Sequence, residues 1–597
     1  MAVPASRASL LTGLILLLTL SASTAVRSVA SPIAGEQPVK QDHFDGPAEL
    51  PRIYIQSQLT DTPTPGKVRL VKQDDNLQDA IDSAKCGDTL KLQAGATFRG
   101  LFRLPAKPCD DSHWIILRTS ASDDSLPREG TRITPCYAGI ASLPGRPDFR
   151  CAAVRNVLAK IEFDRQADSG PILFQDGANH YRLIGLEITR AVPGLHMRNL
   201  IQPGTLESTA HHLVFDRLWL HGTAEDETKG GIHLSGITYA AIVDSYFTDF
   251  HCIALKGSCT DAQAVNGGGR DAPGGPYKIL NNFLEASGEN ILFGGAPGST
   301  TPADIEIRHN YFFKPMIWKP DQPGFVGSAT GNAFIVKNLF ELKNAQRVLF
   351  EGNVLENVWG GFSQSGFAIL LTPANQDNAC PLCRVTDVTI RYNKIRHCAS
   401  VLQIAIALNK AGTSAAAGER YSIHDLVVDD IDGEAYKGFG NFLTIVSINV
   451  PIKDVLIDHV TAFPPKALIT IQNGVNHAKL GNFTITNNVF NAGPRQIASA
   501  GGGRTNCATV PGNHPEDLWN SCFDNSTFAH NVIIDGKGSW PGDNVFIGAG
   551  EAGISDLHKV NASQYRPCAK KGSTACKKLP RVGADIEAIE RATAGVD

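Results

Sequence analysis

One short pattern recurs down most of the chain: an apolar pair, one or two polar residues, an Asn or a substitute for it, and further apolar residues. Clear copies are KILNNFLEASG, EIRHNYFF, LFEGNVLEN, TIRYNKI and TITNNVFNAG. The equivalent positions are Gly185, Arg217, Ser245, Asn282, Asn310, Asn353, Asn393, Asp430, His459, Asn488 and Asn531. They are 28 to 43 residues apart, as in 310 − 282 = 28 and 353 − 310 = 43. A fixed core with irregular insertions is typical of a solenoid whose turns carry variable loops.

Each repeat also carries a second apolar segment, for example GGIHLSG, NILFGG, FAILLTP and ALITIQN. Two or three short strands per turn, each paired with the turns above and below, form parallel sheets with few open edges. The predicted fold class is therefore all-β: a right-handed parallel β-helix (solenoid) with an N-terminal capping helix and an irregular C-terminal cap. The Asn residues of the repeat are expected to bond along the stack, not to bind a ligand.

The composition agrees with this fold, and the net charge argues against nucleic acid as a partner. The 597 residues include 57 Gly and only 3 Met, and 19% are charged, which favours a turn-rich β protein. A formal net charge of −4 provides no global positive field, so we expect no nucleic-acid partner.

The N-terminus reads as an export signal. Arg7 supplies a positive charge, residues 10–20 a short apolar run, and Ser28-Val29-Ala30 a small-residue cleavage site, with a cut after Ala25 as the alternative. The run is too short for a comfortable membrane span. We predict a secreted monomer, extracellular or periplasmic, with no membrane association after cleavage.

Four segments follow from these features. Residues 1–30 are the predicted signal peptide, 31–65 a linker or extended arm, 66–540 the β-helix domain, and 541–597 a C-terminal cap and tail. Within them, 76–84 has the apolar spacing of a short helix that covers the first coil, and 585–594 that of a short terminal helix. A separate small C-terminal domain is the alternative for the last segment.

Thirteen cysteines in an exported chain favour disulfides, and most lie in local pairs. The predicted pairs are Cys86/Cys109, Cys136/Cys151, Cys252/Cys259, Cys507/Cys522 and Cys568/Cys576. The three remaining residues, Cys380, Cys383 and Cys398, leave one thiol over. A metal site at Cys380 and Cys383 is less favoured, because no second Cys or His pair follows at the usual spacing.

The stretch LQDAIDSAKCGDTLKLQAGATFRG, followed by the strand WIILRT, resembles the N-terminal cap of the pectate-lyase-like superfamily. The resemblance covers roughly residues 70–540 and implies a parallel β-helix that acts on carbohydrate. The chain departs from the family's activity signatures. The nearest Asp-His pair, Asp458-His459, is distant from the acidic loops, and the paired aspartates of the β-helix hydrolases are reduced to Asp429-Asp430.

Residues 252–315 form a Gly-rich excursion in which carboxylates gather. Asp261, Glu285 and Glu289 are the predicted ligands of a calcium ion, because carboxylates on neighbouring rungs in an oxygen-rich setting suit Ca²⁺. The alternative is that these acids cap turns and face solvent.

Strand alternation adds cations to this region. With Ile253 and Leu255 pointing inward, Lys256 and Lys337 are expected to flank Gly294 in one outward column. The predicted catalytic residues are Lys256, Arg270 and Lys337. The predicted substrate-binding residues are Gln263, Lys314, Trp318 and Trp359.

These residues favour a polysaccharide lyase that acts on an acidic polysaccharide by calcium-assisted β-elimination. Calcium would neutralise the C5 carboxylate, and a lysine or arginine would take the C5 proton. A β-helix glycoside hydrolase is one alternative, with Glu285 and Glu289 as its carboxylates. A non-catalytic glycan-binding or adhesive surface protein is another. A metal site among the scattered histidines His211, His212, His221, His233 and His251 is the least favoured.

Overall fold

The computed structural model describes residues 43–597 except 150, 164–168, 192, 363, 408–411, 449, 474–478, 502–505, 510–513, 557–559 and 567–577. Residues 43–597 form one compact unit. The predicted signal peptide lies outside the described residues, as do the first part of the predicted arm and the pair Cys568/Cys576. No helix in the described ranges is long and apolar enough to cross a membrane.

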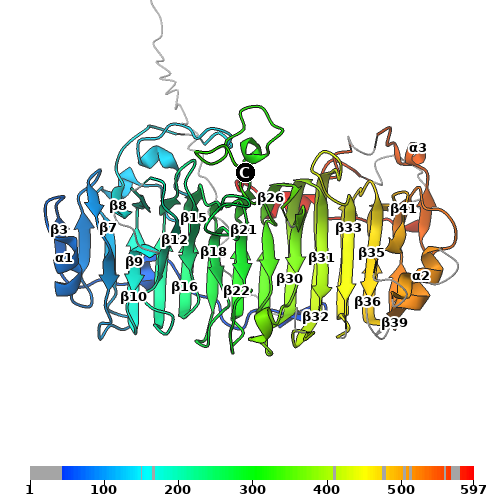
Figure 1. Cartoon of the computed structure of the whole chain (residues 1–597), viewed down its shortest axis with the longest axis horizontal. Coiled ribbons are helices and arrows are strands. Elements are labelled where there is room, and N and C mark those ends of the chain that lie inside the picture. Colours follow the sequence, from blue (N-terminus) through cyan, green and yellow to red (C-terminus); the bar gives the residue numbers. More distant parts are fainter. Residues whose placement is uncertain are drawn as a thin grey trace, which may run out of the picture. The chain divides into compact units, whose positions relative to one another are not determined.

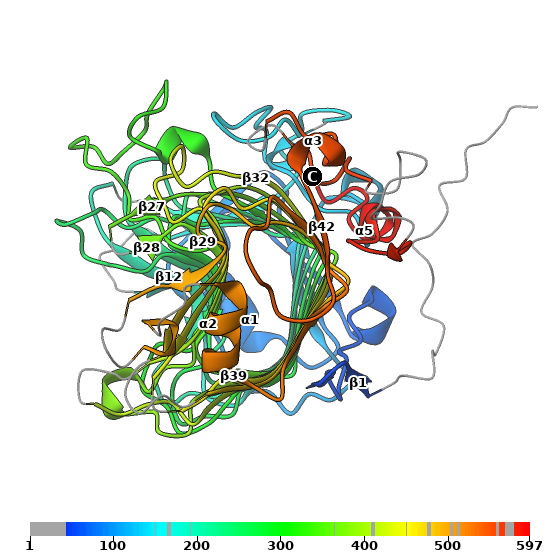
Figure 2. The ribbon, with the colours of Figure 1, turned by 90° about the vertical axis from the view of Figure 1, so that its right-hand side faces the viewer.

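The chain is an all-β parallel β-helix, as predicted (Figure 1). One turn consists of three strands, β16 (Ile237–Val243), β17 (Tyr246–Thr248) and β18 (Gln263–Gly267), each of which pairs in parallel with its counterpart in the turn before and the turn after. Figure 2 looks along the stack and shows successive turns superimposed.

Within the described residues, the third strand of each turn belongs to a twelve-stranded sheet. Its members are β6 (Phe102–Leu104), β9 (Ser169–Phe174), β12 (Met197–Pro203), β15 (Thr228–His233), β18, β21 (Glu289–Phe293), β24 (Phe340–Leu342), β29 (Phe367–Leu371), β31 (Ser400–Ile406), β33 (Asn441–Ser447), β35 (Ala467–Asn473) and β38 (Ile497–Ser499).

The other strands of each turn join a larger sheet that bends around the core. Its members are β3 (Val68–Val71), β4 (Thr89–Leu92), β5 (Thr97–Arg99), β7 (Ile115–Thr119), β8 (Ala159–Phe163), β10 (Ala178–Ile184), β11 (Leu186–Arg190), β13 (Ala210–Asp216), β14 (Trp219–His221), β16, β17, β19 (Tyr277–Leu280), β20 (Phe283–Glu285), β22 (Ala303–Arg308), β23 (Tyr311–Phe313), β25 (Ala345–Glu351), β26 (Val354–Val358), β30 (Arg384–Cys398), β32 (Ala417–Ile431), β34 (Lys453–Ala462), β36 (Leu480–Thr486), β37 (Val489–Asn491), β39 (Phe523–Asp524), β40 (Thr527–Ala529), β41 (Val532–Ile534) and β42 (Val545–Ile547).

Apolar side chains stack in columns inside the coil. One column on the twelve-stranded sheet is formed, rung by rung, by Ile201, Ile232, Val265, Ile291 and Phe340, all of them buried. Parallel register places equivalent side chains of successive turns next to each other. Each turn therefore adds to one continuous core.

The repeated Asn residues bond along the stack. The Asn310 side-chain oxygen accepts from the backbone and side-chain nitrogens of Asn282, and the Asn353 oxygen receives the same two bonds from Asn310. The residue before each Asn has a positive φ, 56° at both Asn281 and His309, which turns the chain between two strands. The predicted structural role of the ladder is confirmed.

Helices close the two ends of the core. Helix α1 (Leu77–Ser83) begins after Asn76, whose side chain accepts from two backbone amides, and its apolar face joins the core. At the other end, α2 (Pro515–Cys522) inserts Leu518 and Trp519 into the same core.

The two terminal segments lie along the flank of the coil. Helix α5 (Ile586–Ala592) packs against β30 and β32, and the carbonyl of Val596 accepts from Arg132, near the start of the chain. Near the other terminus, β1 (Phe44–Asp45) pairs with β2 (Ala48–Glu49). From there the chain crosses many rungs, since Asp45 bonds His424 whereas the Ser57 carbonyl accepts from Arg182. The described part of the segment predicted as a linker or arm is thus bound to the coil.

Five disulfides are present among the described residues. Four match the predicted local pairs: Cys86–Cys109, Cys136–Cys151, Cys252–Cys259 and Cys507–Cys522. The fifth joins Cys380 to Cys383, and Cys398 is left as a buried thiol.

The predicted alternation fails in two excursions. Residues 252–262 form turns instead of a strand, and Leu255, expected to point inward, is 87% exposed. Residues 333–337 contain only a single bridge, in which Phe334 pairs antiparallel with Ile253. The two loops bond to each other through their backbones, and neither continues the parallel ladder of its rung.

The Asn ladder generates the first prediction. Replacement of Asn310 by Ala should lower the free energy of unfolding by about 2 to 4 kcal/mol, because a buried amide and two buried carbonyls lose their partners. Chemical denaturation measures the change. Asn520→Ala, at an exposed helical position, is the control and should be nearly neutral. Equal effects of the two substitutions would contradict a stabilising ladder.

Candidate functional site

A cavity of about 890 Å³ lies on the outer face of the twelve-stranded sheet, over β12, β15 and β18. Its wall holds three cations, Arg198, Lys229 and Arg270, together with His233. The acidic residues that line it, Glu207 and Asp271, are exposed. The cavity therefore offers positive charge to a ligand.

Hydrogen bonds between rungs form the floor of the cavity. Asn199 donates to Gln202 at 2.7 Å, and Asn266, two rungs away, donates to the Asn199 oxygen at 3.3 Å. Gly230 on the intervening rung makes this possible, because a Cβ there would lie 2.2 Å from the Asn199 oxygen. The Asn266 oxygen in turn accepts from Nδ1 of His233, so Nε2 of that ring carries the lone pair.

Glycines set the position of Arg270. In the run Gly267–Gly269, Gly268 has a φ of 79°, and a Cβ on it would lie 2.6 Å from the backbone nitrogen of Gly294. This close approach of two turns directs the following residues out over the sheet. The Arg270 guanidinium donates to the carbonyls of Thr205 and Leu206, which fixes it at the cavity wall.

Burial changes the titration of the groups in the wall. Desolvation lowers the pKa of Lys229, and the neighbouring Arg198 lowers it further. Desolvation also lowers the pKa of His233 to about 4, so this ring is neutral at pH 7. A lysine whose pKa is lowered by burial and by a neighbouring arginine has the properties of a general base.

Four of the predicted site residues meet at the edge of the same sheet that is formed by the first residues of β18 and β21. Gln263 donates to Glu289 at 2.9 Å, in register on β18 and β21. Lys337 forms an ion pair with Asp261, and its nitrogen lies 3.7 Å from the Glu289 carboxylate. These four residues form what we call the edge cluster.

The edge cluster holds two groups with shifted pKa values. Burial, together with the nearby carboxylate of Glu341, raises the pKa of Glu289 to about 7. Burial lowers the pKa of Lys337 to about 8. Lys229 and Glu289 influence each other electrostatically, which links this cluster to the cavity.

Two other predicted residues are buried and form ion pairs or hydrogen bonds within the protein. The Glu285 carboxylate receives a bidentate ion pair from Arg146, at 2.7 and 2.8 Å, and is fully buried. Lys314 is also buried, and its ammonium donates to the carbonyls of Ala286 and Ser287, among others.

The remaining predicted residues lie in or under the paired loops. Lys256 is exposed on the 252–262 loop and does not share a column with Lys337. Trp318 and Trp359 pack against Phe334 and are 1% and 3% exposed, so neither presents a free ring face to a sugar. Arg270 is the one predicted residue that lines the cavity.

The three predicted calcium ligands do not come together. Arg146 neutralises Glu285, and Lys337 faces both Asp261 and Glu289, so a cation already occupies the position of the ion. Among the described residues, the groups that could hold a metal are Asp111/His180/His212 and Glu227/Cys252/Cys259. The donor set therefore does not fit Ca²⁺, and no chemical step is derived through it.

Sequence reasoning missed Arg198, Lys229 and the role of His233. The available signal was the position of Lys229 directly before the strand GGIHLSG, and of Arg198 at the equivalent place one rung earlier. A repeat alignment built on the third strand of each turn, instead of on the Asn ladder, brings these two cations into one column.

No protein-family model matches the chain, and no curated protein matches its sequence. Among solved structures, the chain is similar to an alginate lyase from Paenibacillus sp. str. FPU-7, with 14% identity, a TM-score of 0.32, and coverage of 68% of this chain and 94% of that one. It is similar to the family 6 alginate lyase AlyGC, with 13% identity, a TM-score of 0.41, and coverage of 89% and 59%. A family 6 polysaccharide lyase from Pseudopedobacter saltans gives 12% identity, a TM-score of 0.39, and coverage of 86% and 98%. At these values the likeness transfers no residue, substrate or activity to this chain.

The raised pKa of Glu289 generates the second prediction. Its value in the folded protein, about 7, lies above the ordinary 4.5, so the folded state gains protons that the unfolded state has lost. The stabilisation is complete below pH 4.5 and is lost as the pH rises through 7. Between pH 5 and pH 8 the protein should lose on the order of 3 kcal/mol more stability than Glu289→Gln.

Denaturation at several pH values measures this difference. The same substitution at the exposed residue Glu207, Glu207→Gln, provides the matched control. Parallel stability curves for the native protein and Glu289→Gln would show that Glu289 titrates normally.

Proposed function

We propose that the protein is a polysaccharide lyase that cleaves an acidic polysaccharide at the cavity on the twelve-stranded sheet. The observation that carries the proposal is the placement of Arg198, Lys229 and Arg270 around one cavity with an uncharged polar floor. Two arginines beside a lysine suit a polymer that carries a carboxylate on each sugar.

β-Elimination from a 4-linked uronic acid needs three actions. Arg198 and Arg270 neutralise the C5 carboxylate, which makes the C5 proton acidic. Lys229, in its neutral form, takes that proton, while the C5 electron pair forms the C4–C5 double bond and the bond from C4 to the bridging oxygen breaks. The ammonium of Lys229 then returns a proton to the leaving oxygen. The Nε2 lone pair of His233 accepts from a sugar hydroxyl and orients the ring.

Lys337 is the competing candidate for the base. Its pKa is lowered to about 8, a favourable value, but its ammonium faces Asp261 and Glu289 instead of the cavity. We assign it the role of holding the two carboxylates, which keeps the edge of the sheet in place beside Lys229.

A glycoside hydrolase is the second candidate, and the edge cluster favours it. Glu289, with its pKa raised to about 7, retains a proton near neutral pH, and Glu341 is the carboxylate that raises this pKa. Hydrolysis of a glycosidic bond uses a pair of carboxyl groups, one of which has a raised pKa. A hydrolase releases reducing ends without the ultraviolet absorbance of an unsaturated sugar.

An extracytoplasmic location completes the hypothesis, and the proposed mechanism does not use calcium. The N-terminal signal features and the five disulfides support an oxidising, extracytoplasmic location. Calcium assistance stays a prediction, tested by turnover with and without a chelator. Because Arg198 and Arg270 already supply positive charge, we expect turnover in the presence of the chelator.

The two lysines provide the third prediction. With the acidic polysaccharide that the native protein cleaves, Lys229→Ala should lower kcat by at least about a hundredfold, because the base is lost. Lys337→Ala should lower kcat by about tenfold or less, because it disturbs only the neighbouring carboxylates. The ultraviolet absorbance of the unsaturated product measures both.

Lys256→Ala, on the exposed loop, is the matched control and should retain native turnover. A collapse of kcat in Lys337→Ala with activity retained in Lys229→Ala would move the base to the edge cluster. The absence of an absorbing product from every acidic polysaccharide in a broad panel would contradict the lyase hypothesis.

A further inference from the structure

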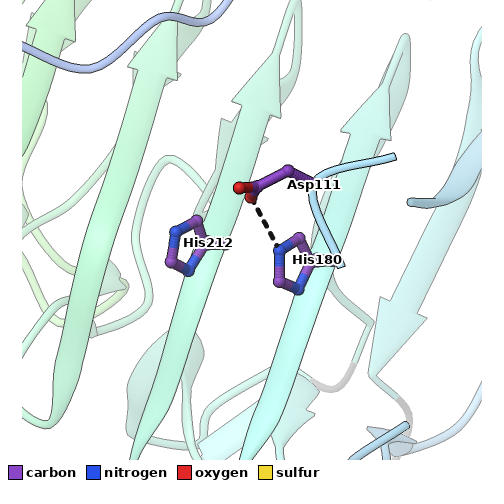
Figure 3. Close-up of side chains that lie close together, drawn as sticks. All are labelled: Asp111, His180 and His212. Carbon is purple, nitrogen blue, oxygen red and sulfur yellow. Dashed lines mark hydrogen bonds and ion pairs between the residues drawn. The ribbon is translucent and has the colours of Figure 1, made fainter. Parts of the chain in front are cut away.

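A second group of ligand-type side chains lies on the larger sheet (Figure 3). Asp111 comes from the loop before β7, His180 from β10 and His212 from β13. One potential ligand atom from each of the three lies within 4.8 Å of the others. Nothing in the proposed cleavage of a polysaccharide uses this group.

The hydrogen bond of His180 to Asn179 leaves its Nε2 atom directed toward Asp111. Asn179 donates its amide hydrogens to the carbonyls of Lys107 and Gly177, so its oxygen is an acceptor and Nδ1 of His180 must donate to it. Nε2 is then the ring atom left for another partner, and it faces the Asp111 carboxylate at 3.1 Å. An ion beside these two atoms can take one ligand from each.

Neighbouring histidines supply further donors. His180 and His212 occupy equivalent positions on adjacent rungs, both with positive φ, and their rings stack with centroids 4.7 Å apart. The Nδ1 atoms of His211 and His212 lie 2.7 Å apart, so one more imidazole nitrogen borders the group. The other candidate group, Glu227/Cys252/Cys259, is excluded because its two cysteines form a disulfide.

We propose that Asp111, His180 and His212 bind a divalent transition-metal ion, zinc, with His211 or water as the fourth ligand. Zinc takes imidazole nitrogen and carboxylate oxygen at about 2.0 to 2.2 Å in tetrahedral geometry. The His180–Asp111 separation of 3.1 Å already suits two ligands of one such ion. His212 completes the set by rotating its ring out of the stack, and the exposed Asp111 adjusts to it.

The ion has a structural role at this position. Asp111 follows Cys109, which is bridged to Cys86, and the loop is also attached to the coil by the hydrogen bond from Asn179 to the Lys107 carbonyl. A zinc ion would attach the same loop to two successive rungs of the larger sheet. It would thereby stabilise the N-terminal end of the coil, where a rung has few neighbouring rungs on one side.

The experiment uses the full chain, stripped of metal and titrated with Zn²⁺ alone, with calorimetry and elemental analysis as readouts. We expect one tightly bound zinc per chain and a rise in the melting temperature. Asp111→Asn and His212→Ala should each weaken the binding by at least about tenfold and remove the rise. Substitution by Co²⁺ should give the absorption of a tetrahedral site in the native protein but not in His212→Ala.

Matched controls lie on the same loop. Asp110 and His113 are exposed and bond to each other, so Asp110→Asn and His113→Ala keep the proposed ligands and should bind zinc like the native protein. Asp111→Asn is isosteric and exposed, so its loss of zinc does not depend on unfolding. Failure of the native protein to bind zinc would overturn the proposal, as would unchanged binding in both ligand variants.

Discussion

Hydrogen bonding between successive rungs is the constraint on which the rest of the structure depends. The parallel backbone ladders and the buried Asn side chains hold each turn in register with its neighbours, and Asn310 alone connects three rungs. Once register is fixed, equivalent side chains stack in columns, and insertions are forced into the loops between strands. Both the apolar core and the charged groups outside it therefore follow from the same stacking.

The fold could be predicted because its signal is repeated many times. Each Asn unit carries the same turn, with a positive φ before the Asn, so a single misjudged repeat changes little. The site is not repeated. Residues 252–257 have the apolar pattern of a strand, yet they form turns that bond to another loop, 333–337, about eighty residues later. Alternation carries no information once the chain leaves the sheet.

Ion pairs between residues far apart in the sequence limited which site residues could be predicted. Glu285 is neutralised by Arg146, which precedes it by 139 residues and arrives on a disulfide-closed loop. No local pattern contains that contact. Asp261 and Glu289, expected as ligands of one calcium ion, lie near each other, but Lys337, expected to flank Gly294, pairs with Asp261 and lies 3.7 Å from Glu289. Local register could place the carboxylates of Asp261 and Glu289 near each other, but it could predict neither their contact with Lys337 nor the ion pair of Glu285 with Arg146.

The arrangement of charge separates structural from available groups. The side chains of Arg146, Lys314 and Glu285 form hydrogen bonds inside the protein. Arg198 and Lys229, by contrast, have no ion-pair partner among the described residues and border an open cavity. Basic side chains without an ion-pair partner, placed above an uncharged polar floor, are the physical basis for assigning an anionic ligand. The glycines at 230 and 268 make this possible, since a side chain at either would collide with the groups that shape the cavity.

The most direct measurement is a calorimetric titration of the full chain with oligouronides and with the same oligosaccharides after reduction of their carboxylates to alcohols. The account predicts that at least one oligouronide binds, that its reduced form does not, and that Arg198→Ala weakens the binding. Equal binding of the charged and the reduced forms would contradict it, because the cations of the cavity would then have no part in recognition.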